Sequence, residues 1–217
     1  MDFRQTSERV NAICRRSFLA GASGLLMTTA CRTKGNAARP DLYACEGCDA
    51  VLERRADTLG WEMDVARGEP GEPLVLEGRV YQVDGRTPAQ GVVIYMHQTN
   101  ARGLYANGSP ETENSRRHGR LRGWARTDAA GRFRFVTIKP APYPDMTMPA
   151  HIHLTVLEPE RPPYYVDDVV FDGEFKVDQS YRARQELRGG SGIVRLSRDS
   201  QGRWRARRNI ILERHPD

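Results

Sequence analysis

The sequence contains no apolar run long enough to cross a lipid bilayer as a helix, which takes about 20 residues. It also has no internal repeat or low-complexity tract. Within these residues, a membrane-spanning helix and a repeat architecture are therefore excluded. Neither sign of charge dominates, since 33 basic and 28 acidic residues give a net charge of +5. The remaining composition, 39% hydrophobic over 217 residues, is enough for one domain with extensions.

Cysteine is scarce, and of the four cysteines only Cys45 and Cys48 follow Cys31. A zinc site would need two further ligands, and the nearest histidine, His97, is distant in sequence. A thioredoxin-like role would need a βαβ context, which is absent. We therefore expect Cys45 and Cys48 to form a local disulfide in an oxidising compartment, with a redox or metal role as the alternative.

Residues 1–30 have the pattern of an export signal rather than of a folded segment. The pair Arg15-Arg16, followed by Phe18-Leu19 and a short apolar run, resembles a twin-arginine signal, which exports folded proteins. The run ends in TTAC, which resembles a lipoprotein cleavage box and would leave Cys31 as a lipid-bearing N-terminus. Ordinary signal cleavage is the other option. We expect a periplasmic or membrane-anchored lipoprotein, or a secreted protein.

Loss of residues 1–30 would remove four arginines and two acids, so the net charge would fall from +5 to +3. This mild excess gives no strong case for a nucleic-acid partner. The oligomeric state does not follow from the sequence, and a homodimer is one open option.

From Leu74 onward the pattern is that of short β-strands separated by turns. LVLEGRVYQV and GVVIYMHQ flank DGRTPAQ, and LRGWART and GRFRFVTI flank DAA, so we interpret each pair as a hairpin. IHLTVLE, YYVDDVVF and a C-terminal pair around DSQG complete seven or eight strands. The series predicts an all-β fold, an antiparallel β-sandwich with little helix. We expect an export signal at 1–30, a connector at 31–73 and the sandwich at 74–217.

Two tyrosines and two histidines between residues 105 and 153 are the candidate metal ligands. His151 and His153 lie in the predicted strand PAHIHL, where residues two apart project from the same face. Tyr143 stands between two prolines that restrict its backbone, and Tyr105 lies in a loop rich in glycine. A phenol, with a pKa of about 10, binds a metal well only when the ion is acidic enough to remove its proton. Two tyrosinates with two neutral imidazoles therefore favour Fe(III).

The same residues carry a family resemblance. GWARTDAAGRFRFVTIKPAPYP followed by PAHIHL, together with HQTNARGLY, resembles the intradiol ring-cleavage dioxygenases that act on catechol and protocatechuate. The similarity covers roughly Leu74 to Gly173. It implies a sandwich with long active-site loops, non-haem Fe(III), a catechol-type substrate, O2 and a cis,cis-muconate-type product. By position, Tyr105 and Tyr143 are the catalytic tyrosine ligands, and His151 and His153 the histidine pair.

Three positions depart from the family pattern on its substrate side. Met148 stands where an arginine is usual, His97 where a tryptophan is usual, and Asp168 where a glutamine is usual. We interpret all three as candidates for the substrate pocket, and for His97 a satisfied polar residue is the alternative. Arginines of the segment SRRHGRLRGWAR, among them Arg122 and Arg126, are candidates to replace the charge missing at Met148 or to bind a substrate carboxylate. The alternative for this segment is a solvated loop.

Two other functions stay open at this stage. One is a non-catalytic, secreted β-sandwich that binds a polyphenol or a carbohydrate on the same scaffold. The other is a structural periplasmic lipoprotein in which the four candidate ligands coincide by accident. A tyrosinate-to-iron absorption band would count against both.

Overall fold

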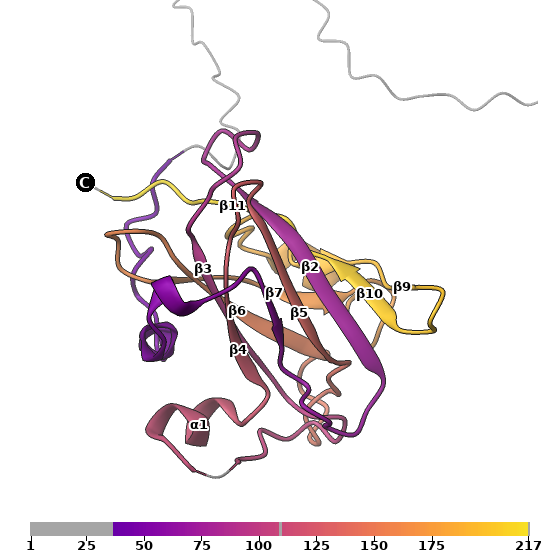
Figure 1. The fold of residues 1–217 in the computed structure, drawn as a ribbon. Helices are drawn as coiled ribbons and strands as arrows, with labels where there is room; N and C mark the ends of the chain where they lie inside the picture. The colour runs from indigo at the N-terminus through magenta and orange to yellow at the C-terminus, as the bar shows by residue number, and fades with distance from the viewer. Residues whose placement is uncertain (1–36, 109, 217) are drawn as a thin grey trace, which may run out of the picture. The chain divides into compact units, whose positions relative to one another are not determined.

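Two β-sheets face each other in the part of the chain that the computed structural model describes, residues 37–108 and 110–216. Figure 1 shows β2 and β5 in one layer and β3, β4 and β6 in the other. The fold is mostly β with little helix, as predicted from the sequence. The predicted export signal and the lipidation site Cys31 lie outside the described residues. No helix among the described residues is long and apolar enough to cross a membrane.

The first sheet has the order β1-β5-β2-β10-β9, and β11 also pairs with β2. Its strands are β1 (Glu62–Asp64), β2 (Pro73–Tyr81), β5 (Arg132–Ile138), β9 (Ser197–Arg198), β10 (Trp204–Arg207) and β11 (Ile210–Ile211). The central pair β2–β5 is antiparallel. Three short strands instead make parallel pairings, β1 with β5, and β10 and β11 with β2, so this sheet is mixed rather than antiparallel as predicted.

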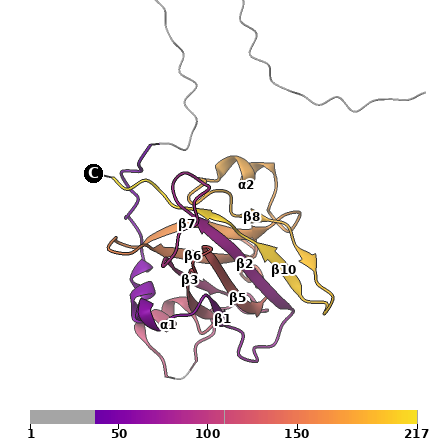
Figure 2. The ribbon, with the colours of Figure 1, turned by 45° about the horizontal axis from the view of Figure 1, so that its top comes forward.

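The second sheet has the order β4-β3-β6-β7-β8 and carries the candidate site. Its strands are β3 (Val93–Gln98), β4 (Arg122–Arg126), β6 (His151–Leu157), β7 (Tyr164–Phe171) and β8 (Ile193–Val194). All of these pairings are antiparallel except β7–β8. Figure 2 labels β8 together with the short helix α2 (Gln179–Arg184), which follows β7 in the chain.

The two hairpins predicted before residue 140 are wrong, because β2 and β3, like β4 and β5, belong to different sheets. The turn chemistry itself is present. The Asp84 carboxylate accepts the backbone N–H of Thr87, and the Asp128 carboxylate accepts that of Arg132, each at 2.8 Å. After each turn the chain crosses to the other layer. β3 is buried along nearly its whole length, so it fits the centre of a covered sheet and not the half-exposed arm of a hairpin.

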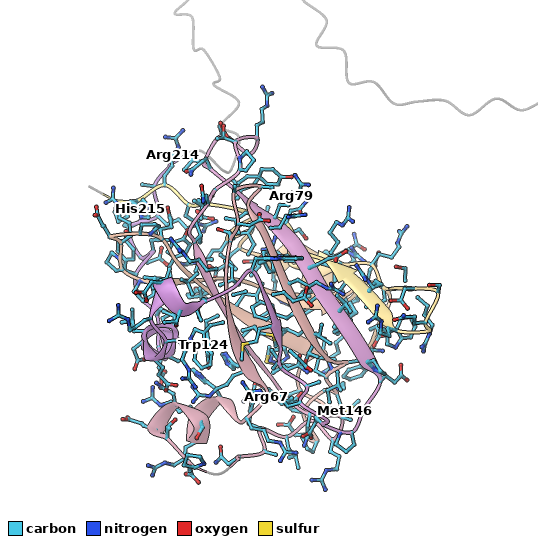
Figure 3. All side chains as sticks on the ribbon, viewed as in Figure 1. Arg67, Arg79, Trp124, Met146, Arg214 and His215 are labelled. Atoms are coloured by element: carbon cyan, nitrogen blue, oxygen red, sulfur yellow. A yellow bond between two sulfur atoms is a disulfide. The ribbon has the colours of Figure 1, made fainter. Side chains whose placement is uncertain are left out.

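The main core lies between the two sheets, and a smaller apolar cluster covers the outer face of the second sheet. Ile94 and Met96 of β3 point into the main core, whereas Val93 and Tyr95 point outward. The outer side chains are covered by the 3₁₀ turn η1 (Cys48–Glu53), to which the indole of Trp124 donates a hydrogen bond at the Ala50 carbonyl. Figure 3 labels Trp124 beside this turn.

The segment predicted as a connector, 31–73, is only partly a connector. Residues 37 to 73 contain η1, a second 3₁₀ turn η2 (Ala56–Thr58) and the strand β1, whose residues Glu62 to Asp64 pair with Arg134 to Val136 of β5. The described part of this segment therefore packs on both sheets.

Candidate metal centre

The histidine pair lies on the outer face of the second sheet at one end of β6. Ile152 and Leu154 are fully buried in the main core, so the alternating residues His151 and His153 project to the opposite side. β6 runs between β3 and β7, which fixes the direction of both imidazoles. His153 pairs directly with His97 of β3.

Tyr105 is presented by a tight loop that follows β3. The side-chain oxygen of Asn100 accepts the backbone N–H groups of Arg102 and Leu104, at 2.9 and 3.2 Å, and so closes the loop just before the tyrosine. Gly119, after the helix α1 (Glu113–His118), packs against the Tyr105 backbone so closely that an added Cβ would lie 3.0 Å from its Cα.

Tyr143 is presented by a second loop that packs on the first. The hydroxyl of Thr99 donates to the Ala141 carbonyl at 2.8 Å, and the backbone N–H of Ala141 donates to the Asn100 carbonyl. Gly103 has a φ of +76°, and a Cβ there would stand 2.0 Å from the Pro142 carbonyl oxygen. Only glycine permits this approach, and the approach holds the two tyrosine loops together.

The four candidate ligand atoms form a closed ring. The Tyr105 hydroxyl lies 3.1 Å from the Tyr143 hydroxyl, which lies 3.1 Å from Nε2 of His151. That nitrogen lies 3.1 Å from Nε2 of His153, which lies 3.0 Å from the Tyr105 hydroxyl. The structure thus brings together all four residues predicted from the sequence.

The outer nitrogens of the two imidazoles define their tautomers. Nδ1 of His151 donates to the Pro149 carbonyl at 2.8 Å, and Nδ1 of His153 donates to the Asp168 carboxylate at 2.9 Å. In the neutral rings both Nε2 atoms then carry lone pairs. Two lone pairs that face each other at 3.1 Å, with no proton between them, form a site for a cation.

The spacing also fits a metal ion. Bonds of about 2.0–2.2 Å to nitrogen and oxygen ligands place neighbouring ligand atoms roughly 3 Å apart when they meet at right angles. The four observed distances of 3.0 to 3.1 Å match this spacing. His151, His153 and Asp168 also come close enough to form a metal-binding group, but Asp168 contacts the side of His153 that faces away from the ring of ligand atoms.

Burial favours the uncharged forms of Tyr105 and His151. Desolvation, and then the hydrogen bond with Tyr143, raises the pKa of the Tyr105 phenol far above its ordinary value. Desolvation, followed by the charge of His153, lowers the pKa of the His151 imidazole. His151 is therefore ready to act as a neutral ligand, whereas the Tyr105 phenol needs a strong cation to lose its proton.

His97, expected in the substrate pocket, lies behind His153 instead. Its ring stacks on that of His153 with centroids 4.4 Å apart and on that of His118 with centroids 3.9 Å apart. The hydroxyl of Tyr95 contacts Nδ1 of His118 at 2.8 Å. Burial lowers the pKa of His97 well below the ordinary value and that of His118 to about 4. A column of neutral rings therefore supports the ligand, a role that the sequence pattern did not indicate.

The arginines proposed from the sequence do not reach the site. Arg126 pairs with Val93, four strand positions from His97, or about 13 Å along β3. Arg122 is level with His97, but its guanidinium binds Glu53 at 2.7 Å and stacks over Trp124. Neither is placed to replace a charge at Met148.

A cavity of about 360 Å³ adjoins the metal centre, and two of the substrate-side candidates, Met148 and Asp168, line it. Pro149, which accepts the hydrogen bond from His151, lines it as well. The four candidate ligands are not among its lining residues. The cationic groups in its wall are Lys176 and Arg184. Neither was predicted from the sequence, because they lie in α2 and the turn before it, where no motif marks them.

The two cysteines after Cys31 are joined in a disulfide, with Cα atoms 5.7 Å apart. Cys48 begins η1 and is buried, and its sulfur lies 3.8 Å from the Thr155 hydroxyl on the outer face of β6. The disulfide therefore holds the cover of the outer face and stands apart from the four ligand atoms.

Comparison with known proteins agrees with this geometry. Residues 52–191, well over half of the chain, match the family model described as Dioxygenase. The protocatechuate 3,4-dioxygenase beta chain of Burkholderia cepacia is 32% identical over 149 residues, which cover 63% of this chain and 61% of the relative. The chain belongs to the intradiol ring-cleavage dioxygenase family. It spans about three fifths of the length of that curated relative.

Solved structures of intradiol dioxygenases share the fold. The dioxygenase domain of a dioxygenase carbohydrate-binding fusion from Streptomyces sp. SirexAA-E has a TM-score of 0.53 at 22% identity, over 69% of this chain and 86% of that one. An intradiol ring-cleavage dioxygenase from Tetranychus urticae gives 0.53 at 17% identity, over 74% and 91%. Catechol 1,2-dioxygenase from Acinetobacter sp. ADP1 gives 0.52 at 20% identity, over 71% and 57%.

Proposed function

We propose that this intradiol-family chain is a non-haem Fe(III) dioxygenase that cleaves the ring of a catechol-type substrate with O2 to a cis,cis-muconate-type product. The observation that carries the proposal is the ring of four ligand atoms, two phenolic oxygens and two unprotonated imidazole nitrogens, each 3.0 to 3.1 Å from the next. Family membership supports the reaction class.

Tyr105, Tyr143, His151 and His153 would hold the iron. When bound, ferric iron supplies the Lewis acidity that ionises phenols and draws electron density from a catecholate ring. Ionised Tyr105 and Tyr143, with two neutral histidines, leave one positive charge on Fe(III). A doubly ionised catechol is the small anion that such a site would bind most strongly.

Tyr143 is the residue to which we assign proton transfer from the substrate. Its hydroxyl contacts both the Tyr105 hydroxyl and His151, and it comes from a loop whose next residues, 144–148, are all exposed. The backbone of Tyr105 is instead packed closely against Gly119. The Tyr143 phenolate would therefore accept a catechol proton and turn its side chain toward the exposed part of its loop, while Tyr105 stays in place.

The cavity beside the centre would hold the substrate ring. Met148 and Tyr181 supply apolar and aromatic surface, and Lys176 and Arg184 are the cations in its wall. Lys176 donates to the Thr147 carbonyl at 3.1 Å, close to the loop that carries Tyr143. We infer that Lys176 and Arg184, rather than Arg122 or Arg126, would bind an anionic substituent on the substrate ring.

Oxygen consumption tests the proposal. Protein reconstituted with ferric iron should consume O2 with a catechol from a panel of substituted catechols. Mass spectrometry should find both atoms of isotopically labelled O2 in a ring-opened diacid. Tyr143→Phe should lose most of this rate, whereas Tyr81→Phe, on the other sheet, should keep it. Protein that binds a catechol without consuming O2 would contradict the proposal and favour the non-catalytic polyphenol-binding alternative.

A further inference from the structure

A β-bulge opposite His153 shapes the far side of the metal centre. Ile152 pairs with Val169 and Leu154 with Val166, so β7 places two residues, Asp167 and Asp168, against the single residue His153. An extra residue in one strand redirects its side chains, and bulges occur often beside active sites. Here the bulge places a carboxylate in line with the ring of His153.

The bulge is fixed by contacts that do not involve the histidines. The Asp167 carboxylate accepts the backbone N–H groups of Leu187 and Arg188, at 2.9 and 3.0 Å, and its own N–H donates to the Arg188 carbonyl. Gly192 packs so closely on the Asp168 carbonyl that a Cβ would lie 2.0 Å from the oxygen. The position of Asp168 is therefore built into the strand.

The two histidine ligands differ in what holds them. His151 donates to a neutral backbone carbonyl, that of Pro149, whereas His153 donates to a carboxylate, that of Asp168. A hydrogen bond to an ionised acceptor is roughly twice as strong as a neutral one. A carboxylate on the outer nitrogen also makes the inner nitrogen a stronger metal donor.

We propose that Asp168 is a positioning residue that fixes His153 as the tautomer protonated at Nδ1 and aims its Nε2 at the other three ligand atoms. The carboxylate acts through the imidazole and binds no metal itself. The consequence for iron, tighter binding and a more electron-rich metal, rests on the proposed function. The consequence for the tautomer does not.

The first arm of the test uses metal-free protein with isotopically labelled histidine at about pH 8, above the ordinary histidine pKa of about 6.5. Long-range proton–nitrogen correlation spectra should show His153 protonated at Nδ1 in the parent and in Asp168→Asn, whose amide oxygen can still accept the hydrogen bond. Asp168→Ala should show a mixture of tautomers. Asp172→Asn, which neutralises a carboxylate just after β7 that pairs with Arg182 instead of a histidine, should leave the His153 signals unchanged.

The second arm measures ferric iron affinity by chelator competition, together with the tyrosinate-to-iron absorption band. Asp168→Ala should bind iron about 10 to 100 times more weakly than the parent, with Asp168→Asn in between. In both Asp168 variants the tyrosinate-to-iron band should move to longer wavelength than in the parent, because the iron is more electron-poor. Asp172→Asn should match the parent in both readouts.

The two arms separate the two claims. A parent that binds no ferric iron would overturn the proposed function, while loss of the fixed tautomer in Asp168→Ala would still support the positioning role. An unchanged tautomer in Asp168→Ala would overturn the positioning role even in a protein that binds iron. Unchanged iron affinity in both Asp168 variants of an iron-binding parent would overturn it as well.

Discussion

The two faces of β6 differ in what they contribute: the inner face packs in the main core, and the outer face carries the two candidate histidine ligands. On the inner face, Ile152, Leu154 and Val156 are at most 1% exposed and contribute to the main core. On the outer face, His151 and His153 present their Nε2 atoms to two phenols. Because a strand turns successive side chains to opposite sides, the core that stabilises the sandwich also holds the ligands rigidly.

The largest effect should come from removing an outer-face ligand. His153→Ala removes one donor atom and leaves its three neighbours without a closed ring, so we expect iron in the reconstituted protein to fall to background. The free energy of unfolding of the metal-free protein should fall by about 1.5–3 kcal/mol, the net contribution of one hydrogen bond to a charged group. Metal analysis and urea denaturation measure the two effects, and retained iron would contradict the assignment.

The neighbouring inner-face substitution should show the reverse. Ile152→Ala creates a cavity in the main core and should lower the free energy of unfolding by about 2–5 kcal/mol. Folded molecules should still bind iron, because the backbone of β6 stays paired on both sides. If folded Ile152→Ala protein lost as much iron as His153→Ala, the claim that the inner face of β6 stabilises the fold while the outer face binds iron would be contradicted.

A smaller effect should follow from parting the two tyrosine loops. Gly103→Ala forces a Cβ against the Pro142 carbonyl, so the loops should separate and the tyrosinate-to-iron band should weaken or shift. Gly173→Ala is the matched control, because its φ of +80° carries the same left-handed strain but a Cβ there meets nothing within 4 Å. That strain alone costs about 1–2 kcal/mol. Equal bands in the two variants would contradict the loop contact.

The smallest effect concerns pH. Burial, followed by the charge of His153, lowers the pKa of His118 to about 4, whereas an unfolded chain titrates near the ordinary value of about 6.5. Between these values the unfolded state binds more protons, so this contribution is present above about pH 6.5 and lost as pH falls toward 4. Denaturation midpoints of the metal-free protein should show this slope, and His118→Gln should flatten it. Equal slopes of stability against pH in the parent and in His118→Gln would contradict the lowered pKa of His118.

Part of the arrangement of the four candidate ligands could be predicted from local rules. Strand alternation places His151 and His153 on one face, and the flanking prolines constrain the backbone of Tyr143. The meeting of these residues with Tyr105 was predicted from the family's order of motifs. The approach of Gly103 to Pro142 that joins the two loops could not be derived from either segment alone.

Other features depend on which segments become neighbours, and the sequence pattern did not reveal them. Asp84 and Asp128 correctly marked turns, but turn chemistry does not determine which sheet the next strand joins. Asp168 lines the cavity, but its contact with His153 was not predicted, because only the register shift between β6 and β7 reveals it. Arg126 was a candidate by charge, yet its place on β4 keeps it from the site.

The visible absorption spectrum of the protein after loading with ferric iron tests the central claim most directly. If Tyr105, Tyr143, His151 and His153 bind one ferric ion, a tyrosinate-to-iron band should colour the protein and shift when catechol is added without oxygen. Tyr105→Phe and Tyr143→Phe should each weaken the band. A colourless protein after loading, or a band that both variants keep unchanged, would contradict the account.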